Sequence, residues 1–215
     1  MQIITGTTTT LGERMTAKMF EYRYKVFVEV LGWDLACERG VEKDQFDRED
    51  TVYVLALDDL GELVGIARLL DTSRPYLLGD VFPQLLNGMP KPCDPGIWEL
   101  SRFAVMDFGA ERRGALTQMS SAEAIELIRA SICCAARLGA RALVTVSPLG
   151  VERLLRRSGT HAHRLGPPMV VNDYALFACW IDCEEARASE AELANRIEVN
   201  LRRGVTPSGM HVALA

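Results

Sequence analysis

Charged residues inside apolar strands constrain the fold of this chain more than any other feature. Arg68 interrupts one run of apolar and β-branched residues, and Glu99 and Arg102 interrupt another. A charged side chain is almost never fully buried unless it is paired, because its desolvation is costly. The chain must therefore fold so that these side chains meet countercharges or face a wet cleft. Asp44 and Asp47 are the nearest upstream countercharges.

These five residues have two interpretations. Residue by residue, each fits an ion-pair network that orients a sheet, whereas all five together favour a polar pocket. Strand parity adds a condition, since Glu99 and Arg102 point to opposite faces of a regular strand. They share one pocket only if a bulge falls between them, near Leu100 or Ser101, and bulges are common beside active sites.

Hydrophobic periodicity and turn residues predict a single α/β domain over residues 1–215, with a mixed sheet flanked by helices. After Cys183 the pattern predicts an acidic helical tail that frays from about residue 204. The predicted elements are a helix through Met15, Met19, Tyr22, Val26 and Val30 that ends at Gly32, a loop over 35–50, strands at 51–57, 63–70, 97–105, 142–146, 169–171 and 174–181, and helices near 81–86 and at 121–138 and 151–157.

Composition excludes several classes of protein. The chain has 215 residues, 48% of them apolar, and a formal charge of −5, which excludes disorder and a basic nucleic-acid coat. No apolar run approaches the roughly 18 residues that span a bilayer. The first residues lack a charged segment followed by an apolar one, so we expect a cytoplasmic protein that does not span a membrane and does not bind nucleic acid.

The basic residues are concentrated in one part of the chain. Residues 111–164 contain nine Arg and only four Glu, although the whole chain is acidic. Such a segment suits docking of an acidic partner or of a phosphate-bearing ligand. A solvated, arginine-rich helix face is the alternative.

Six cysteines and an H-x-H pair at His161 and His163 raise the question of a metal site. Cys133 and Cys134 are adjacent, and Cys179 and Cys183 have C-x3-C spacing, so no zinc-ribbon or zinc-finger spacing occurs. We expect these cysteines to be small buried hydrophobic residues, and we predict no metal site.

Several short motifs occur together in a fixed order. They are Arg23-x3-Phe27, Leu31-Gly32-Trp33, Asp44-Gln45-Phe46-Asp47, the strand residue Arg68, and Trp98-Glu99-Leu100-Ser101-Arg102-Phe103. In this order and spacing the set resembles the acyl-homoserine lactone synthases, the autoinducer synthases of bacterial quorum sensing. The resemblance covers roughly residues 20–180, and Arg156-Arg157-Ser158-Gly159 is similar to the helix end that follows the fifth strand in that family.

The resemblance implies a fold and a reaction. The fold is an α/β/α sandwich with a mixed, mostly antiparallel central sheet, similar to the Gcn5-related N-acyltransferases. In the reaction, S-adenosylmethionine is acylated on its amine by an acyl carrier protein thioester and then closes to the lactone with release of methylthioadenosine. S-adenosylmethionine is a substrate, so no cofactor is expected.

The resemblance also implies roles for individual residues. The catalytic polar cluster would be Glu99, Arg102, Asp44, Asp47 and Arg68, with Glu99 accepting the amine proton through water. S-adenosylmethionine would contact Arg23, Phe27, Trp33, Phe82 and Arg102. The acyl chain would contact Ser101, Val105, Met106, Leu143, Thr145, Val146 and Leu149. The acidic carrier protein would dock on Arg153, Arg156, Arg157 and Arg164, with Arg112 and Arg113 as further candidates.

Two other functions remain open at this point. An acyl-CoA-dependent N-acyltransferase of the same fold usually has a (Gln/Arg)-x-x-Gly-x-(Gly/Ala) turn that cradles the pyrophosphate. Here Glu111-Arg112-Arg113-Gly114-Ala115-Leu116 differs at its first and last positions. The second alternative is a non-catalytic protein that senses a small ligand in the same cleft.

Overall fold

The computed structural model describes residues 1–109, 122–171 and 173–188. The strands are β1 (Gln2–Gly6), β2 (Val52–Leu57), β3 (Leu63–Asp71), β4 (Ile97–Val105), β5 (Ala142–Pro148), β6 (Ala162–Arg164), β7 (Met169–Val171) and β8 (Tyr174–Asp182). The helices are α1 (Thr8–Arg23), the π-helix η1 (Tyr24–Val30), α2 (Leu77–Asp80), the 3₁₀ helix η2 (Pro83–Leu86), α4 (Ala122–Arg137) and α5 (Gly150–Ser158).

The strands form one sheet in the order β1-β2-β3-β4-β5-β8-β6, with β7 paired to the other end of β8. Only β4 and β5 run parallel among the described pairs, so the predicted mixed and mostly antiparallel sheet is confirmed. The β2–β3 hairpin closes because Asp58 Oδ1 accepts hydrogen bonds from the amides of Leu60 and Glu62. Gly61 takes a positive φ of 78° in this turn, a conformation that favours glycine.

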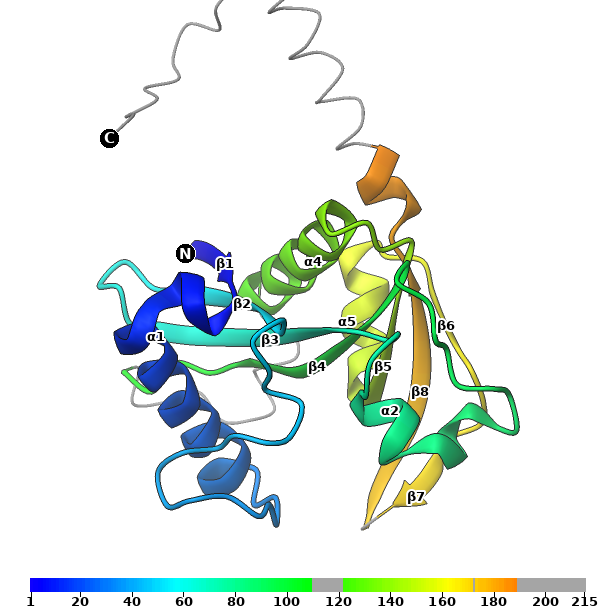
Figure 1. Cartoon of the computed structure of the whole chain (residues 1–215), viewed down its shortest axis with the longest axis horizontal. Coiled ribbons are helices and arrows are strands. Elements are labelled where there is room, and N and C mark those ends of the chain that lie inside the picture. Colours follow the sequence, from blue (N-terminus) through cyan, green and yellow to red (C-terminus); the bar gives the residue numbers. More distant parts are fainter. Residues whose placement is uncertain (110–121, 172, 189–215) are drawn as a thin grey trace, which may run out of the picture.

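Helices cover both faces of the sheet (Figure 1), so the predicted sandwich is confirmed. On one face, α4 and α5 bury an apolar core against alternate residues of the strands, such as Val54 and Leu69. The opposite face has two smaller cores. One packs α1 and η1 on Tyr53 and Ile66, and the other packs α2 and η2 on Leu70. The polar residues described below lie on this second face, which we call the site face.

The parallel strands β4 and β5 separate after a short paired segment. Their pairing covers only Ile97–Glu99 with Ala142–Val144, although both strands continue. Figure 1 shows the two strands diverging beyond this paired segment. The facing edges of the remaining residues therefore lack sheet partners among the described strands.

A bulge in β4 lies one residue beyond the predicted position. Leu100 and Ser101 pair regularly with Leu69 and Arg68, and the register shifts only after them. Arg102 has a φ of 51°, which costs a non-glycine residue on the order of 1–2 kcal/mol. The expectation of a bulge near Leu100 or Ser101 was therefore wrong in position, because the extra residue is accommodated at Arg102 itself. Its effect is as expected, since the turned backbone brings the Arg102 side chain to the site face.

Most predicted elements are confirmed to within two residues, and the N-terminal helix differs most. It begins at Thr8 and continues as a π-helix, whose wider turn rotates the apolar stripe. Val26 is fully buried, whereas Val30 is 46% exposed. The short strands β1 and β6 were not predicted, because they are edge strands without a clear apolar alternation. Residues 184–188 are helical, and the rest of the predicted tail lies outside the described residues.

Across the described ranges, none of the helices combines the length and apolar character required to cross a membrane.

Candidate active site

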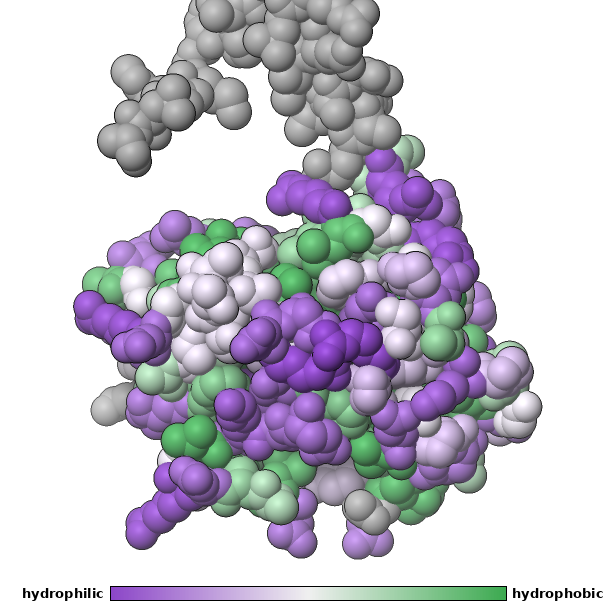
Figure 2. Space-filling model, viewed as in Figure 1, coloured by the Kyte–Doolittle hydropathy of each residue, from purple (hydrophilic) through white to green (hydrophobic). Residues whose placement is uncertain are grey.

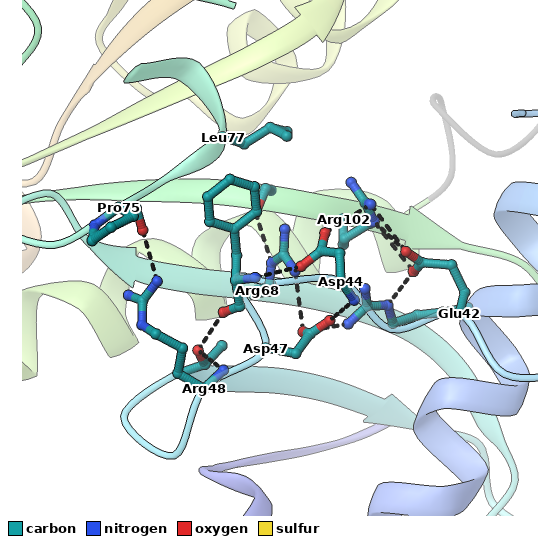
Figure 3. A network of polar contacts seen from close by, with 12 residues as sticks. Glu42, Asp44, Asp47, Arg48, Arg68, Pro75, Leu77 and Arg102 are labelled. Atoms are coloured by element: carbon teal, nitrogen blue, oxygen red, sulfur yellow. Dashed lines mark hydrogen bonds and ion pairs between the residues drawn. The ribbon is translucent and has the colours of Figure 1, made fainter. Parts of the chain in front are cut away.

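An ionic network occupies the middle of the site face. It joins Arg23 at the end of α1, Arg68 on β3 and Arg102 at the bulge of β4 with carboxylates of the loop before β2. We call residues 42–51 the acidic loop. Figure 2 shows hydrophilic residues gathered over the middle of this face, and Figure 3 shows the network from close by.

The acidic loop is folded by its own carboxylates. Asp47 Oδ2 accepts a hydrogen bond of 2.8 Å from the Asp44 amide, and Asp44 Oδ1 accepts one of 2.9 Å from the Phe46 amide. These bonds form a compact turn, for which aspartate is well suited. Thr51 closes the loop by donating to the Phe46 carbonyl at 2.7 Å. Both aspartates thus face the sheet in fixed orientations.

Arg68 binds both aspartates. Its Nη1 lies 2.6 Å from Asp44 Oδ1 and 3.1 Å from Asp47 Oδ1, while its Nε donates to Ser101 Oγ at 3.0 Å. Asp47 Oδ1 also accepts from Tyr53 Oη at 2.8 Å. The strand register explains this meeting, since Arg68 pairs with Tyr53 on one side and Ser101 on the other.

Glu42 joins the other two arginines and was missed by the sequence analysis. It accepts from Arg23 Nε at 2.5 Å and from Arg102 Nη2 at 3.0 Å, and it is 1% exposed. Its position two residues before Asp44 was an available signal. Yet nothing in the sequence separates it from Glu38 and Glu49, which are exposed members of the same stretch.

The charges of the network balance, with three guanidinium groups against three carboxylates. Burial raises the pKa of Glu42, but Arg23 and Arg102 outweigh it and hold that pKa below its ordinary value. The pKa of Asp47 is likewise lowered, because Arg23 and Arg68 outweigh the effect of burial. Glu42 and Asp47 therefore remain anionic partners of the arginines at neutral pH.

Hydrogen-bond donors nevertheless exceed acceptors. Arg23 Nη2 and Arg68 Nη2 are buried without a hydrogen-bond partner among the described residues. An unsatisfied buried donor costs roughly 1–3 kcal/mol. A donor-rich but electrically balanced cluster is suited to a ligand that carries its own carboxylate together with cationic groups.

Two members of the network reach its outer edge. The Asp44 side chain is 15% exposed and that of Arg102 is 6% exposed, whereas those of Arg23, Arg68 and Asp47 are fully buried. In Figure 3 one nitrogen of the Arg102 guanidinium points away from the carboxylates, while Nε and Nη2 bind Glu42 and Nη2 also binds Asp44. A ligand would therefore meet a carboxylate of Asp44 and a guanidinium of Arg102 first.

Two aromatic rings lie beside Arg102. Just after the π-helix, the amide of Trp33 donates a hydrogen bond of 2.9 Å to the Phe27 carbonyl. The rings of Phe27 and Trp33 stack with their centroids 4.8 Å apart. The Arg102 guanidinium carbon lies 5.6 Å from the Phe27 centroid and 5.7 Å from that of Trp33. Phe27 is buried beneath Trp33, which is partly exposed. The sequence analysis correctly brought these two aromatic residues to the polar cluster.

Glu99 lies beside the network but is bound differently. Its two carboxylate oxygens accept hydrogen bonds from the amides of Leu77, at 2.9 Å, and Leu78, at 2.6 Å, at the start of α2. It is completely buried, and burial raises its pKa to about 7, since the two amides, Arg68 and Arg102 offset only part of the desolvation. A carboxyl with this pKa can accept or hold a proton at neutral pH.

The other predicted contacts of the small ligand and of the acyl chain are divided between the two faces. Phe82 and Val146 pack in the site-face core with Leu77. Ser101 binds Arg68, and Met106 packs against the core beneath α1. In contrast, Leu143 and Val105 lie in the core beneath α4, and Leu149 is 42% exposed at the end of β5.

Thr145 also faces away from the polar cluster. It lies two residues after Leu143 and therefore on the same face of β5. Its hydroxyl lies 3.1 Å from that of Ser147. The predicted acyl residues thus do not line one wall. They lie on both faces of β4 and β5 and just beyond the ends of these strands.

Three of the predicted basic residues share a surface. Arg153, Arg156 and Arg157 are exposed on α5, whose other side is buried by Val151, Leu154 and Leu155. Arg164 on β6 instead forms a bidentate ion pair with Glu152, with distances of 2.7 and 2.8 Å. Arg112 and Arg113 lie outside the described residues.

The expected burial of the cysteines is confirmed for three of them, whereas Cys37 and Cys133 are partly exposed and Cys93 is exposed. All six are free, and Cys134, Cys179 and Cys183 are buried. Within the described part of the chain, no group of three or more His, Cys, Asp or Glu side chains is arranged to hold a metal ion.

Comparison with known proteins finds one family over most of the chain. A family described as autoinducer synthase matches residues 8–191. An acyl-homoserine-lactone synthase of Acinetobacter nosocomialis is 52% identical over 182 residues, which cover 85% of this chain and all of that protein.

Solved structures show the same similarity. The crystal structure of TofI in a ternary complex with an inhibitor and MTA is 44% identical, with a TM-score of 0.73 over 85% of this chain and 92% of that one. The CoA-dependent acyl-homoserine lactone synthase BjaI with SAM and isopentyl-CoA is 29% identical, with a TM-score of 0.74 over 91% and 89% of the two chains. An acyl-CoA N-acyltransferase from Pseudomonas aeruginosa, 17% identical with a TM-score of 0.56 over 84% and 99%, shares the fold.

Proposed function

This chain belongs to the autoinducer synthase family and is an acyl-homoserine-lactone synthase, and on that premise we propose which residues bind each substrate and which residue accepts the proton. S-adenosylmethionine binds at the outer edge of the ionic network, and an acyl thioester enters between β4 and β5. The observation that carries this proposal is the grouping at that edge of the Asp44 carboxylate, 15% exposed, the Arg102 guanidinium, 6% exposed, and the partly exposed Trp33 indole.

The amino-acid end of S-adenosylmethionine matches the two accessible ions. Its carboxylate would accept hydrogen bonds from Arg102, and its ammonium would bind Asp44. Arg23 and Asp47 are completely buried, so they would hold Arg102, Arg68 and Asp44 in place rather than contact the ligand. This division differs from the roles that the family resemblance implies, in which Arg23 also contacts S-adenosylmethionine.

The sulfonium would lie against Trp33. A cation over an indole face gains roughly 0.5–2 kcal/mol, and the exposed side of Trp33 is the accessible one because Phe27 covers its other side. Phe82, which packs with Leu77 on the opposite side of the site face, would contact the remainder of the ligand.

Glu99 would accept the proton of the attacking amine through water. Its pKa of about 7 lies close to the ordinary α-amino pKa of about 7.7–8.0, so proton transfer between them needs little driving force. The amine then attacks the thioester carbonyl, the thiol departs, and the carboxylate closes onto the γ-carbon with expulsion of methylthioadenosine. Backbone N–H groups beside the bulge at Arg102 would stabilise the oxyanion.

The acyl donor would be an acyl carrier protein. Its pantetheine arm contains amides, which suit the unpaired edges of β4 and β5, and its acyl chain would contact residues of both faces there. Arg153, Arg156 and Arg157 form an exposed basic surface on α5, which begins directly after β5 and would steer an acidic carrier. Arg164 contributes less, because Glu152 neutralises it.

We place this reaction in the cytoplasm, where free thiols such as the six of this chain persist.

The test uses the purified chain with S-adenosylmethionine and matched acyl-carrier-protein and acyl-CoA donors. Release of methylthioadenosine with faster turnover of the carrier-protein donor supports the proposal. Faster turnover of acyl-CoA overturns the donor assignment. Acylation without methylthioadenosine would indicate a plain N-acyltransferase, and an absence of turnover would indicate a ligand sensor.

A further inference from the structure

Arg48 connects the two sides of the active site. It follows Asp47 directly in the acidic loop, and its Nη1 donates a hydrogen bond of 2.7 Å to the Pro75 carbonyl, across 27 residues of sequence (Figure 3). Its Nε donates to Asp50 at 3.1 Å, and its own amide donates to Thr51 Oγ1 at 3.0 Å. The side chain is 17% exposed and its Nη2 is buried without a hydrogen-bond partner among the described residues, so the guanidinium is only partly exposed to solvent.

The far end of this connection leads to Glu99. Pro75 lies two residues before Leu77, and the amides of Leu77 and Leu78 hold the Glu99 carboxylate. Tyr76 between them is buried, and its hydroxyl donates to the Pro92 carbonyl at 2.8 Å. The segment from Pro75 to Leu78 is short, so the Arg48 contact at Pro75 and the Tyr76 contact at Pro92 together hold the two amides that bind Glu99.

The near end leads to the aspartates. Asp44 and Asp47 lie in the turn that precedes Arg48, and Thr51, which binds the Arg48 amide, also binds the Phe46 carbonyl. The Arg48 guanidinium is a planar donor that can satisfy two acceptors in different directions, which a lysine ammonium does less well.

We propose that Arg48 is a positioning residue for acylation, which sets the distance between the carboxylate that binds the amine and Glu99, which receives its proton. The inference rests on the proposed function of Asp44 and Glu99. In this proposal Arg48 acts through its hydrogen bonds to Pro75, Asp50 and Thr51 and not through contact with a substrate.

The experiment compares Arg48→Met with Arg74→Met. Arg74 also forms an ion pair with Asp50, at 2.7 Å, but its side chain is 52% exposed, so it is a matched control. The first readout is amide hydrogen exchange at Leu77 and Leu78 without substrates. We expect exchange at both amides to quicken in Arg48→Met and to remain unchanged in Arg74→Met.

The second readout is the pH profile of single-turnover acylation. Weaker amide bonds raise the pKa of Glu99 further, because those bonds lower it now, so the acidic limb should move to higher pH in Arg48→Met. We expect a rate loss of about tenfold, since small misplacements of reacting groups are costly, with KM for S-adenosylmethionine nearly unchanged. Arg48→Lys should recover part of the rate.

The outcomes separate this inference from the proposed function. Unchanged exchange at Leu77 and Leu78 in Arg48→Met overturns it, and so does faster exchange with an unmoved pH profile. The inference is also overturned if Arg48→Met and Arg74→Met lower the melting temperature and change both the amide exchange and the acylation rate to the same extent. If Glu99→Gln leaves the wild-type acidic limb intact, the proposed role of Glu99 fails instead, and the coupling to acylation fails with it.

Discussion

Arg102 donates three hydrogen bonds of 3.0 to 3.3 Å to Glu42, a residue 60 positions away in the sequence. This pair connects the bulge of β4 to the acidic loop, directly beside the stacked rings of Phe27 and Trp33. The contact exists because Arg102 has a positive φ that turns its side chain to the site face. The strained backbone and the buried carboxylate therefore act together to place the guanidinium that we assign to the substrate.

The first prediction concerns Glu42. Replacing it with Gln leaves Arg23 and Arg102 with one charge too few among their partners, and removal of one partner of a buried pair costs about 3–5 kcal/mol. We expect Glu42→Gln to lower the free energy of unfolding by that order and to weaken S-adenosylmethionine binding. Denaturant titration measures the first effect. Glu38→Gln, an exposed change in the same stretch, should alter neither, and an equal effect of both variants would contradict the assignment.

Asp44 and Asp47 should separate binding from stability. Asp44 reaches the outer edge, whereas Asp47 is buried among Arg23, Arg68 and Tyr53. We expect Asp44→Asn to raise KM for S-adenosylmethionine roughly 10- to 100-fold, which corresponds to about 1.4–2.8 kcal/mol. Asp47→Asn should chiefly lower the melting temperature. Steady-state kinetics with the acyl donor held saturating, together with calorimetry, would reveal a reversed pattern if our division is wrong.

The pH dependence follows from Glu99. Its pKa is raised to about 7, so the ionised form that accepts a proton becomes populated as pH rises through neutrality. We expect the single-turnover acylation rate to rise with pH up to about 7 and then to level, and Glu99→Gln to be slower by roughly 10²-fold without that limb. A limb of unchanged midpoint in Glu99→Gln would assign the titration to the amine or to another group.

Glu99 also predicts a stability change of known sign. A carboxyl whose pKa is raised in the folded state stabilises the fold while it is protonated, and this contribution is lost as pH rises from its ordinary 4.5 toward 7. The loss is on the order of 2–3 kcal/mol for the wild type. Melting temperatures measured between pH 5 and pH 8 should therefore fall more steeply for the wild type than for Glu99→Gln.

The basic surface of α5 predicts donor-specific effects. Reversing Arg153 and Arg156 to Glu should raise KM for acyl carrier protein about tenfold, more at low salt than at high salt, because steering is screened by ions. KM for S-adenosylmethionine should not change. If both values of KM rise together, the double variant has damaged the fold rather than a docking surface.

The sequence determined which chemistry this chain carries. Arg68, Glu99 and Arg102 stand out because charges within apolar strands require partners, and the two aspartates were found because they lie in a single acidic stretch. Strand β4 was predicted with both bounds correct, since a long apolar run with aromatic residues is a strong local signal. The aromatic pair followed from its spacing to the arginine, as part of the family resemblance.

Only the tertiary structure decided which of those residues are buried, which partners they bind and which can meet a substrate. Glu42 and Glu38 are alike in sequence, yet burial between two arginines selects the first. The bulge lies at Arg102 rather than one residue earlier, Glu99 is held by backbone amides of α2, and Arg48 reaches a carbonyl 27 residues away. These relations depend on register, burial and long-range contact. A side chain's identity fixes its charge and donors, but which partner it meets is set by the path of the backbone around it.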